Sequence, residues 1–156
     1  MGVAADSASA MGEQFMRTAL EMAGRSLAAG GPPVGACIVR DGEVVAAAHN
    51  SVIGELDATA HAEITVIRQA CRELRTLNLT DCDLYVTVQP CAMCLSACHY
   101  AGISSITYGA ALDAMQAITG NELDVDQAAL FAGPIRGGVQ EVECVELLQR
   151  WQSMSR

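Results

Sequence analysis

The sequence predicts an α/β fold in which a mixed sheet is covered by helices on both faces. Three observations predict it: a hairpin signal at Asp41-Gly42, helical periodicity before the hairpin, and strand–helix alternation after it. An antiparallel hairpin joined to strand–helix alternation produces a sheet with both antiparallel and parallel pairs. At 156 residues, the chain has the length of a single domain, 1–156, with its own core.

The expected elements follow in the order helix, strand, strand, helix, strand, helix, strand. Helical spacing of apolar residues predicts the first helix over 9–29, ended by Gly30 and Gly31. The two-residue turn joins strands over 34–40 and 43–49. The elements expected next are a loop over 51–57, a helix over 60–74, a strand over 83–88, a helix over 90–101 with Pro90 in its first turn, and a strand over 104–109.

The two ends of the chain give weaker patterns. Residues 1–8 are small and polar, and we expect them to be disordered. After Ala110 the pattern predicts helical pieces near 113–118 and 145–153 and a short strand near 139–144. We expect 121–156 to act as a tail for specificity or dimerisation.

The net charge and the number of cysteines indicate which substrates and which cell compartment to expect. The formal net charge is −9 and the nine basic residues are scattered in the sequence, which argues against a large nucleic-acid substrate. No apolar run reaches the length of a membrane span. Seven cysteines, an odd number, without a signal peptide indicate a reducing compartment, so we expect a cytoplasmic protein.

Two short motifs carry metal-ligand chemistry: His61-Ala62-Glu63 and Pro90-Cys91-Ala92-Met93-Cys94. Cys91 and Cys94 are three residues apart at an expected helix start, which puts both sulfurs on one face, where the helix dipole favours thiolates. With His61 at another helix start, three protein ligands leave the fourth position of a tetrahedral zinc ion open. An open position is typical of catalytic zinc.

Glu63 follows His61 by two residues and is free to act on water instead of binding the metal. Zinc lowers the pKa of a bound water to about 7, and a nearby carboxylate can take and return its proton. The alternatives for Cys91 and Cys94 are a structural zinc knuckle, a redox pair or two core cysteines. No second C-x-x-C completes a four-cysteine site, which disfavours the knuckle.

The blocks around both motifs resemble the cytidine deaminase superfamily, whose signature H-x-E…P-C-x-x-C they match. The match is strongest for the branch of guanine deaminases and tRNA adenosine deaminases, over Phe15 to Asp113. The segment 58–64 (ATAHAEI) resembles that branch's P-T-A-H-A-E-I, and 84–94 (LYVTVQPCAMC) resembles its L-Y-V-T-x-E-P-C-x-M-C. Met93 favours this branch over cytidine deaminases, which carry P-C-G-x-C.

The resemblance implies a three-layer α/β/α sandwich, a bound Zn²⁺, a homodimer and further site residues. Asn50 matches the Asn that hydrogen-bonds the substrate base. Gly35 and Ala36 match a turn whose backbone lies against that base. The backbone of Ala62 is expected to contact the base, and that of Cys91 the oxygen bound to zinc.

Two departures from the family pattern bear on the site. Gln89 replaces the usual Glu beside the cysteine motif, and Ala58 replaces the usual Pro before His61. The first is expected to alter hydrogen bonding around the metal, and the second to loosen the loop before His61. Asp113 lies close to the position of a C-terminal Asp that helps proton transfer in guanine deaminases; the alternative is a helix N-cap.

These features together predict a zinc-dependent hydrolytic deaminase of a nucleobase or related aminated heterocycle, releasing ammonia. Guanine is favoured, because the segment 31–36 (GPPVGA) resembles the G-G-P-F-G-A of guanine enzymes and the chain is acidic. A tRNA adenosine deaminase and a cytosine or cytidine deaminase remain alternatives. A silent zinc-stabilised partner subunit is a further one, although an intact Glu63 argues against it. We expect a small nucleobase as the substrate, with tRNA less favoured, and no membrane partner.

Overall fold

A computed structural model describes residues 2–120, 133–134 and 136–154, with the side chains of 2–9 and 151 left out. The chain divides into two units, Met1–Asp124 and Val125–Arg156. All elements that bear on the candidate site belong to the first unit. Within the described residues, no helix is both long and apolar enough to cross a membrane.

The first unit is built on a four-stranded mixed sheet in the order β2-β1-β3-β4. The strands are β1 (Gly35–Arg40), β2 (Glu43–His49), β3 (Cys82–Val88) and β4 (Ser105–Ala110). β1 pairs antiparallel with β2 and β3, whereas β3 pairs parallel with β4. The predicted combination of a hairpin with a parallel crossover is therefore confirmed.

The hairpin turn between β1 and β2 has the geometry that its two residues favour. Asp41 and Gly42 adopt φ angles of 52° and 77°, and the strand partners on either side are Arg40 and Glu43. Positive φ at both central residues defines the tight turn whose twist matches the strands, and Asp-Gly is a preferred pair for it.

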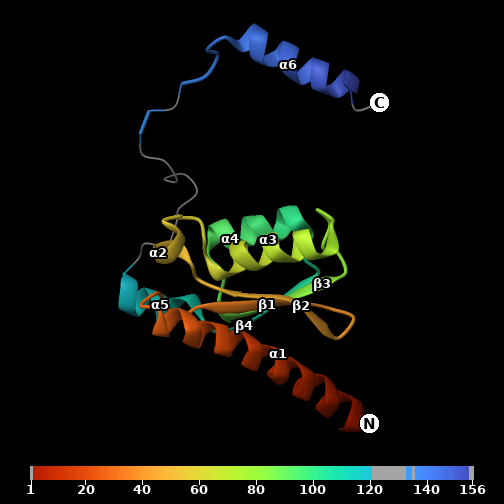
Figure 1. Cartoon of the computed structure of the whole chain (residues 1–156), viewed down its shortest axis with the longest axis vertical. Helices are drawn as coiled ribbons and strands as arrows, with labels where there is room; N and C mark the ends of the chain where they lie inside the picture. The colour runs from red at the N-terminus through yellow and green to blue at the C-terminus, as the bar shows by residue number, and fades with distance from the viewer. Residues whose placement is uncertain (1, 121–132, 135, 155–156) are drawn as a thin grey trace. The chain divides into compact units, whose positions relative to one another are not determined.

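Helices cover both faces of this sheet (Figure 1). The long helix α1 (Gly2–Ala28) lies on one face, and α3 (Ala62–Leu74) and α4 (Ala92–Ala101) lie on the other. One group of buried residues fills the space between the sheet and α3 and α4, with Ile38, Val66 and Leu84 among its members. A smaller group, Phe15, Cys37 and Val39, packs on the α1 side. The predicted α/β/α sandwich is confirmed.

Several boundaries differ from the sequence expectation. α1 begins at Gly2, inside the segment expected to be disordered, because residues 2–8 contain no proline and continue the helical pattern. The expected loop over 51–57 contains a single helical turn, α2 (Val52–Glu55). Pro90 precedes the N-cap of α4, so it does not lie in the first turn of that helix as predicted.

Two helices follow the sheet along the chain, each in its own unit. α5 (Leu112–Thr119) in the first unit confirms the helical piece predicted near 113–118. α6 (Glu141–Met154) in the second unit covers most of the strand predicted over 139–144, and that prediction is wrong. The alternation there is too short to decide, whereas Glu141 and Glu143 lie in the first turn, where acidic side chains stabilise a helix.

Candidate active site

The three predicted metal ligands come together at the starts of two helices. His61 is the N-cap of α3 and Cys91 is the N-cap of α4, both with extended backbone. Cys94 lies in the first turn of α4 and is fully buried. Within the described residues, these three side chains form a group whose ligand atoms all lie within 4.8 Å of one another.

The spacing of the three ligand atoms fits a zinc ion. The Nδ1 atom of His61 lies 3.7 Å from the Sγ of Cys91 and 3.5 Å from that of Cys94. Zinc bonds of about 2.3 Å to sulfur and 2.0 Å to nitrogen, in a tetrahedron, place sulfur and nitrogen about 3.5 Å apart. The residues can therefore hold zinc through one imidazole nitrogen and two sulfurs, and the ring atom that faces the sulfurs is Nδ1.

Hydrogen bonds within this group favour the thiolate form of Cys91 and the thiol form of Cys94. The hydrogen bond from the Cys94 thiol lowers the pKa of Cys91 to about 4, and the same bond raises the pKa of Cys94. The hydrogen bond to Cys91 raises the pKa of His61. Zinc binding requires deprotonated ligands, so it would release the proton that the sulfurs share.

Glu63 lies in the first turn of α3, beside the metal-ligand group. Its side chain is only 4% exposed. Burial raises the pKa of this carboxyl group, whereas a hydrogen bond from Cys94 opposes that shift. A buried carboxyl group with a raised pKa is suited to accepting and returning a proton.

A cavity of about 200 Å³ opens next to this group. Its polar lining includes Asn50, Glu63 and Gln89, together with His61 and Cys91. The rest of the lining is mostly apolar and comes from several segments: Pro32, Val34, Val52, Ile53, Val88, Leu112, Met115 and Thr119. An apolar cavity with few polar groups is typical of a small-molecule site.

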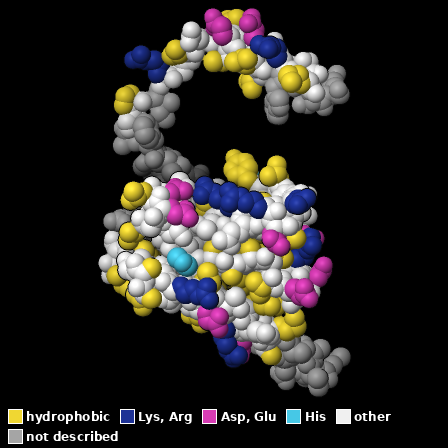
Figure 2. Space-filling model, viewed as in Figure 1, with side chains coloured by type: hydrophobic (Ala, Val, Ile, Leu, Met, Phe, Trp, Pro, Cys, Tyr) yellow, Lys and Arg dark blue, Asp and Glu magenta, His cyan; other side chains and the backbone are white. Residues whose placement is uncertain are grey.

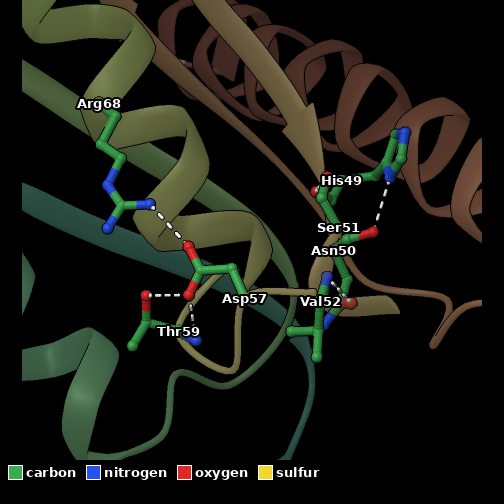
Figure 3. Close-up of polar contacts among 7 residues, drawn as sticks. All are labelled: His49, Asn50, Ser51, Val52, Asp57, Thr59 and Arg68. Carbon is green, nitrogen blue, oxygen red and sulfur yellow. Dashed lines mark hydrogen bonds and ion pairs between the residues drawn. The ribbon is translucent and has the colours of Figure 1, made fainter. Parts of the chain in front are cut away.

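The side chain of Asn50 has a fixed orientation in this lining. Its Oδ1 atom accepts a hydrogen bond from the backbone N–H of Val52 at 3.2 Å (Figure 3). The Nδ1 atom of His49 lies within hydrogen-bond distance of the backbone oxygen of Asn50, at 2.8 Å. Since Oδ1 is engaged, the Nδ2 amide is the group that Asn50 has left to donate to a substrate.

The loop before His61 is held by Asp57 despite the replacement of the usual proline by Ala58. The Asp57 carboxylate accepts hydrogen bonds from the backbone N–H and the hydroxyl of Thr59 at 2.9 and 2.7 Å. It also pairs with Arg68 at 3.4 Å (Figure 3). Hydrogen bonds from Thr59 and the nearby Arg68 hold the pKa of Asp57 below its usual value. The expected loosening is therefore countered by this local network.

Four other predicted site residues lie outside the cavity lining. Gly35, Ala36 and Ala62 are buried, and Val34 lines the cavity at the start of β1. A Cβ atom on Gly35 would overlap the α1 backbone at Ala19 and Ala23, so packing also explains this glycine. Asp113 is exposed in the first turn of α5, whose N-cap is Ala111, so the alternative of an N-cap at Asp113 is wrong. The predicted contacts of these four residues with substrate stay predictions.

Gln89 has a contact that the sequence did not indicate. Its Oε1 atom accepts a hydrogen bond from the backbone N–H of Leu112 at 3.1 Å. The apolar lining from α2 and α5 was also missed, because it depends on how distant segments meet. Helical spacing of Leu112, Met115 and Thr119 was the one available signal in the sequence.

Most cysteines outside the motif are core residues. Cys37, Cys82 and Cys98 are buried, and Cys71 is half-buried. Burial raises the pKa of Cys37 to about 12. Cys144 is exposed within its own unit. His99 is exposed on α4.

Comparison with known proteins agrees with this arrangement. The family model described as the cytidine and deoxycytidylate deaminase zinc-binding region matches residues 10–110. The chain is 46% identical over 98 residues to a tRNA-specific adenosine deaminase of Aquifex aeolicus. It is 43% identical over 99 residues to a guanine deaminase of Bacillus subtilis. Each match covers 63% of this chain, which spans 65% and 64% of the length of these two relatives.

A solved structure extends the match over most of the chain. The X-ray structure of guanine deaminase from Bacillus subtilis superposes with a TM-score of 0.76 at 34% identity, covering 90% of this chain and 93% of that one. The family match includes both zinc-ligand motifs and all four strands. The chain therefore belongs to the family of cytidine and deoxycytidylate deaminase zinc-binding domains.

Proposed function

We propose that this protein is a zinc-dependent hydrolytic deaminase that replaces an amino group on a nucleobase by oxygen and releases ammonia. One observation carries the proposal: a buried carboxyl group, Glu63, lines the same small cavity as His61 and Cys91, two of the three residues of the metal-ligand group. Among the described residues, Glu63 is the one carboxylate in that lining.

Each group in the cavity has a part in this proposal. Zinc, when held by His61, Cys91 and Cys94, supplies a Lewis acid with an open position that lowers the pKa of water to about 7. Glu63 takes one proton from the attacking water and delivers it to a ring nitrogen, and it then moves the second proton, from the hydroxyl on the attacked carbon, to the amine, which leaves as ammonia as the C=O bond forms. The free amide of Asn50 donates a hydrogen bond to the base, and the apolar lining excludes competing water.

Guanine is the substrate that we propose first. Similarity to a guanine deaminase extends over 90% of this chain. The chain has a net charge of −9. Basic and acidic side chains are interspersed on the face drawn in Figure 2. A net negative charge without a large basic patch disfavours the phosphate contacts that dominate affinity for nucleic acid. We further propose that the protein acts in the cytoplasm, on the basis of its seven free cysteines.

Adenosine in tRNA is the second candidate, and two observations favour it. A tRNA-specific adenosine deaminase is 46% identical to this chain over 98 residues. Three of the nine basic residues, Arg68, Arg72 and Arg75, are exposed; the first two lie one turn apart on α3 and Arg75 is its C-cap, although the sequence as a whole shows no basic run. Arginines at this spacing can contact successive phosphates, but Arg68 is already paired with Asp57.

An assay of ammonia release tests both candidates. The zinc-loaded protein is incubated with guanine, adenine, cytosine, their nucleosides and a tRNA that carries adenosine in its anticodon. Release from guanine alone supports the first proposal, and release from the tRNA at low salt, suppressed at high salt, supports the second. No release from any of these substrates by protein with full zinc content contradicts the proposed function.

A further inference from the structure

The side chain of Gln89 connects the zinc-ligand segment to α5. Gln89 lies between the end of β3 and Cys91, and its backbone N–H donates to the oxygen of Ala110 at 2.8 Å. Its Oε1 atom accepts from the N–H of Leu112, the first residue of α5, at 3.1 Å. The residue therefore contacts both sides of the junction between β4 and α5.

The first turn of α5 needs a hydrogen-bond acceptor from outside the helix. The first N–H groups of any helix have no acceptor within the helix, and a side-chain oxygen at the N-cap is the usual solution. The N-cap of α5 is Ala111, which has no side-chain oxygen and makes no capping bond. In the described structure, Gln89 Oε1 supplies an acceptor to the first of these N–H groups.

The packing of α5 against the rest of the unit is limited. The helix spans Leu112–Thr119, only eight residues, none of them is fully buried, and Met115 packs partly buried against the core. Helices of this length are marginal on their own in water. Yet three of its residues, Leu112, Met115 and Thr119, belong to the cavity lining. Any loss of α5 would therefore open one wall of the cavity.

We propose that Gln89 is a positioning residue of the substrate cavity: it caps α5 from the neighbouring strand end and so keeps that wall formed. The proposal deepens the proposed function and rests on it where it concerns substrate. When a binding-competent form is only partly populated, apparent affinity falls by the populated fraction. Loss of the cap should therefore raise KM and leave kcat almost unchanged, since bound substrate restores the wall.

Replacing Gln89 by Met keeps the bulk of the side chain and removes the acceptor. For Gln89→Met we expect KM to rise roughly fivefold, the size of a lost helix cap, with kcat within about twofold and full zinc content. Gln89→Glu keeps an acceptor oxygen and adds a charge that a helix N-terminus favours, so it should restore the KM of the unaltered protein. Gln69→Met, at an exposed position on α3, is the matched control.

Hydrogen exchange tests the cap without any substrate. Amides of 112–119 should exchange roughly fivefold faster in Gln89→Met, with β3 and α4 unchanged, and Gln89→Glu should return them to the original rate. Unchanged exchange in α5, or a fall in kcat with constant KM, would overturn the proposal. If the unaltered protein deaminates no substrate, the proposed function fails, whereas the exchange rates still decide whether Gln89 caps α5.

Discussion

The two sides of the cavity differ in how firmly the fold holds them. On the side of α3 and α4, Glu63, Cys91 and Cys94 are 4%, 7% and 0% exposed and lie against the sheet core. On the opposite side, α2 and α5 contribute no buried residue, and Ile53 is 61% exposed. The groups proposed to carry the reaction are thus held by the core, whereas much of the lining proposed to fit the substrate is held by two short helices without a fully buried residue.

This difference suggests a division of roles. Reaction chemistry requires fixed distances between ligand atoms, which only packed elements provide. Substrate fit tolerates more movement, and it can change without altering the metal site. We therefore expect substitutions on the α3 and α4 side to abolish activity or folding, and substitutions on the α2 and α5 side to change KM and substrate preference.

The largest effect is expected on removal of a metal ligand. Cys94→Ala leaves one sulfur and one imidazole, too few for a tight zinc site, so zinc content should fall below a tenth of the original and ammonia release should be lost. Cys98→Ala, one turn further along α4 and also buried, is the control and should keep its zinc. Metal content and ammonia release are measured on both variants. Zinc retained by Cys94→Ala would contradict the assignment of Cys94 as a metal ligand.

Glycine-to-alanine substitutions compare the packing of the sheet with that of α2 in terms of stability. Gly35→Ala forces a Cβ atom into the backbone of α1, and we expect it to lower the free energy of unfolding by about 3 kcal/mol. Gly54→Ala on α2 meets no atom within 4 Å, so it should be neutral or stabilise the protein by up to about 1 kcal/mol. Denaturant unfolding measures both changes in free energy, and equal effects would show that α2 is packed as closely as β1 is against α1.

Asn50 tests the substrate contact at the border between the two sides. Asn50→Ala should raise KM about tenfold, because it removes both the proposed hydrogen bond to the base and the bond to Val52. Asn78→Ala is a close control, since Asn78 makes the same local bond, to the N–H of Thr80 at 3.0 Å, outside the cavity lining. Steady-state kinetics give the KM of both variants, and similar values would show that Asn50 does not bind the substrate.

The smallest effect is expected within α5 itself. Met115→Ala enlarges the cavity and should raise KM about threefold while changing the ratio of rates on different bases, because one lost apolar contact has a modest effect. Ile118, on the same helix, is 85% exposed and is outside the cavity lining. In Ile118→Ala, the KM and the ratio of rates on different bases should therefore stay constant. An unchanged substrate ratio in Met115→Ala would mean that α5 does not shape specificity.

The sequence predicted the elements that local patterns define. Asp41-Gly42 located the hairpin, and the strands and main helices followed within a few residues. The single turn α2 is too short to show a period, and the alternation over 139–144 favoured a strand where α6 formed. A segment as short as α2 takes its structure from tertiary contacts that propensity does not contain, whereas the described side chains of α6 are exposed and that helix follows local preferences which the alternation concealed.

The site residues likewise divide into those that a local motif predicts and those that depend on contacts between distant segments. His61, Cys91 and Cys94 were predicted because metal ligation demands particular residue types at fixed spacing, and the structure brings them together. The cap from Gln89 and the lining by Ile53 join segments far apart in sequence, and no local pattern marks them.

The most direct test of the account replaces Glu63 by Gln in the zinc-loaded protein. Glu63→Gln keeps the size of the side chain and removes the group proposed to carry the proton. We predict unchanged zinc content and unfolding free energy within about 1 kcal/mol, with ammonia release reduced about 10³-fold on the preferred base. A variant that holds zinc and deaminates at the original rate would contradict the central claim.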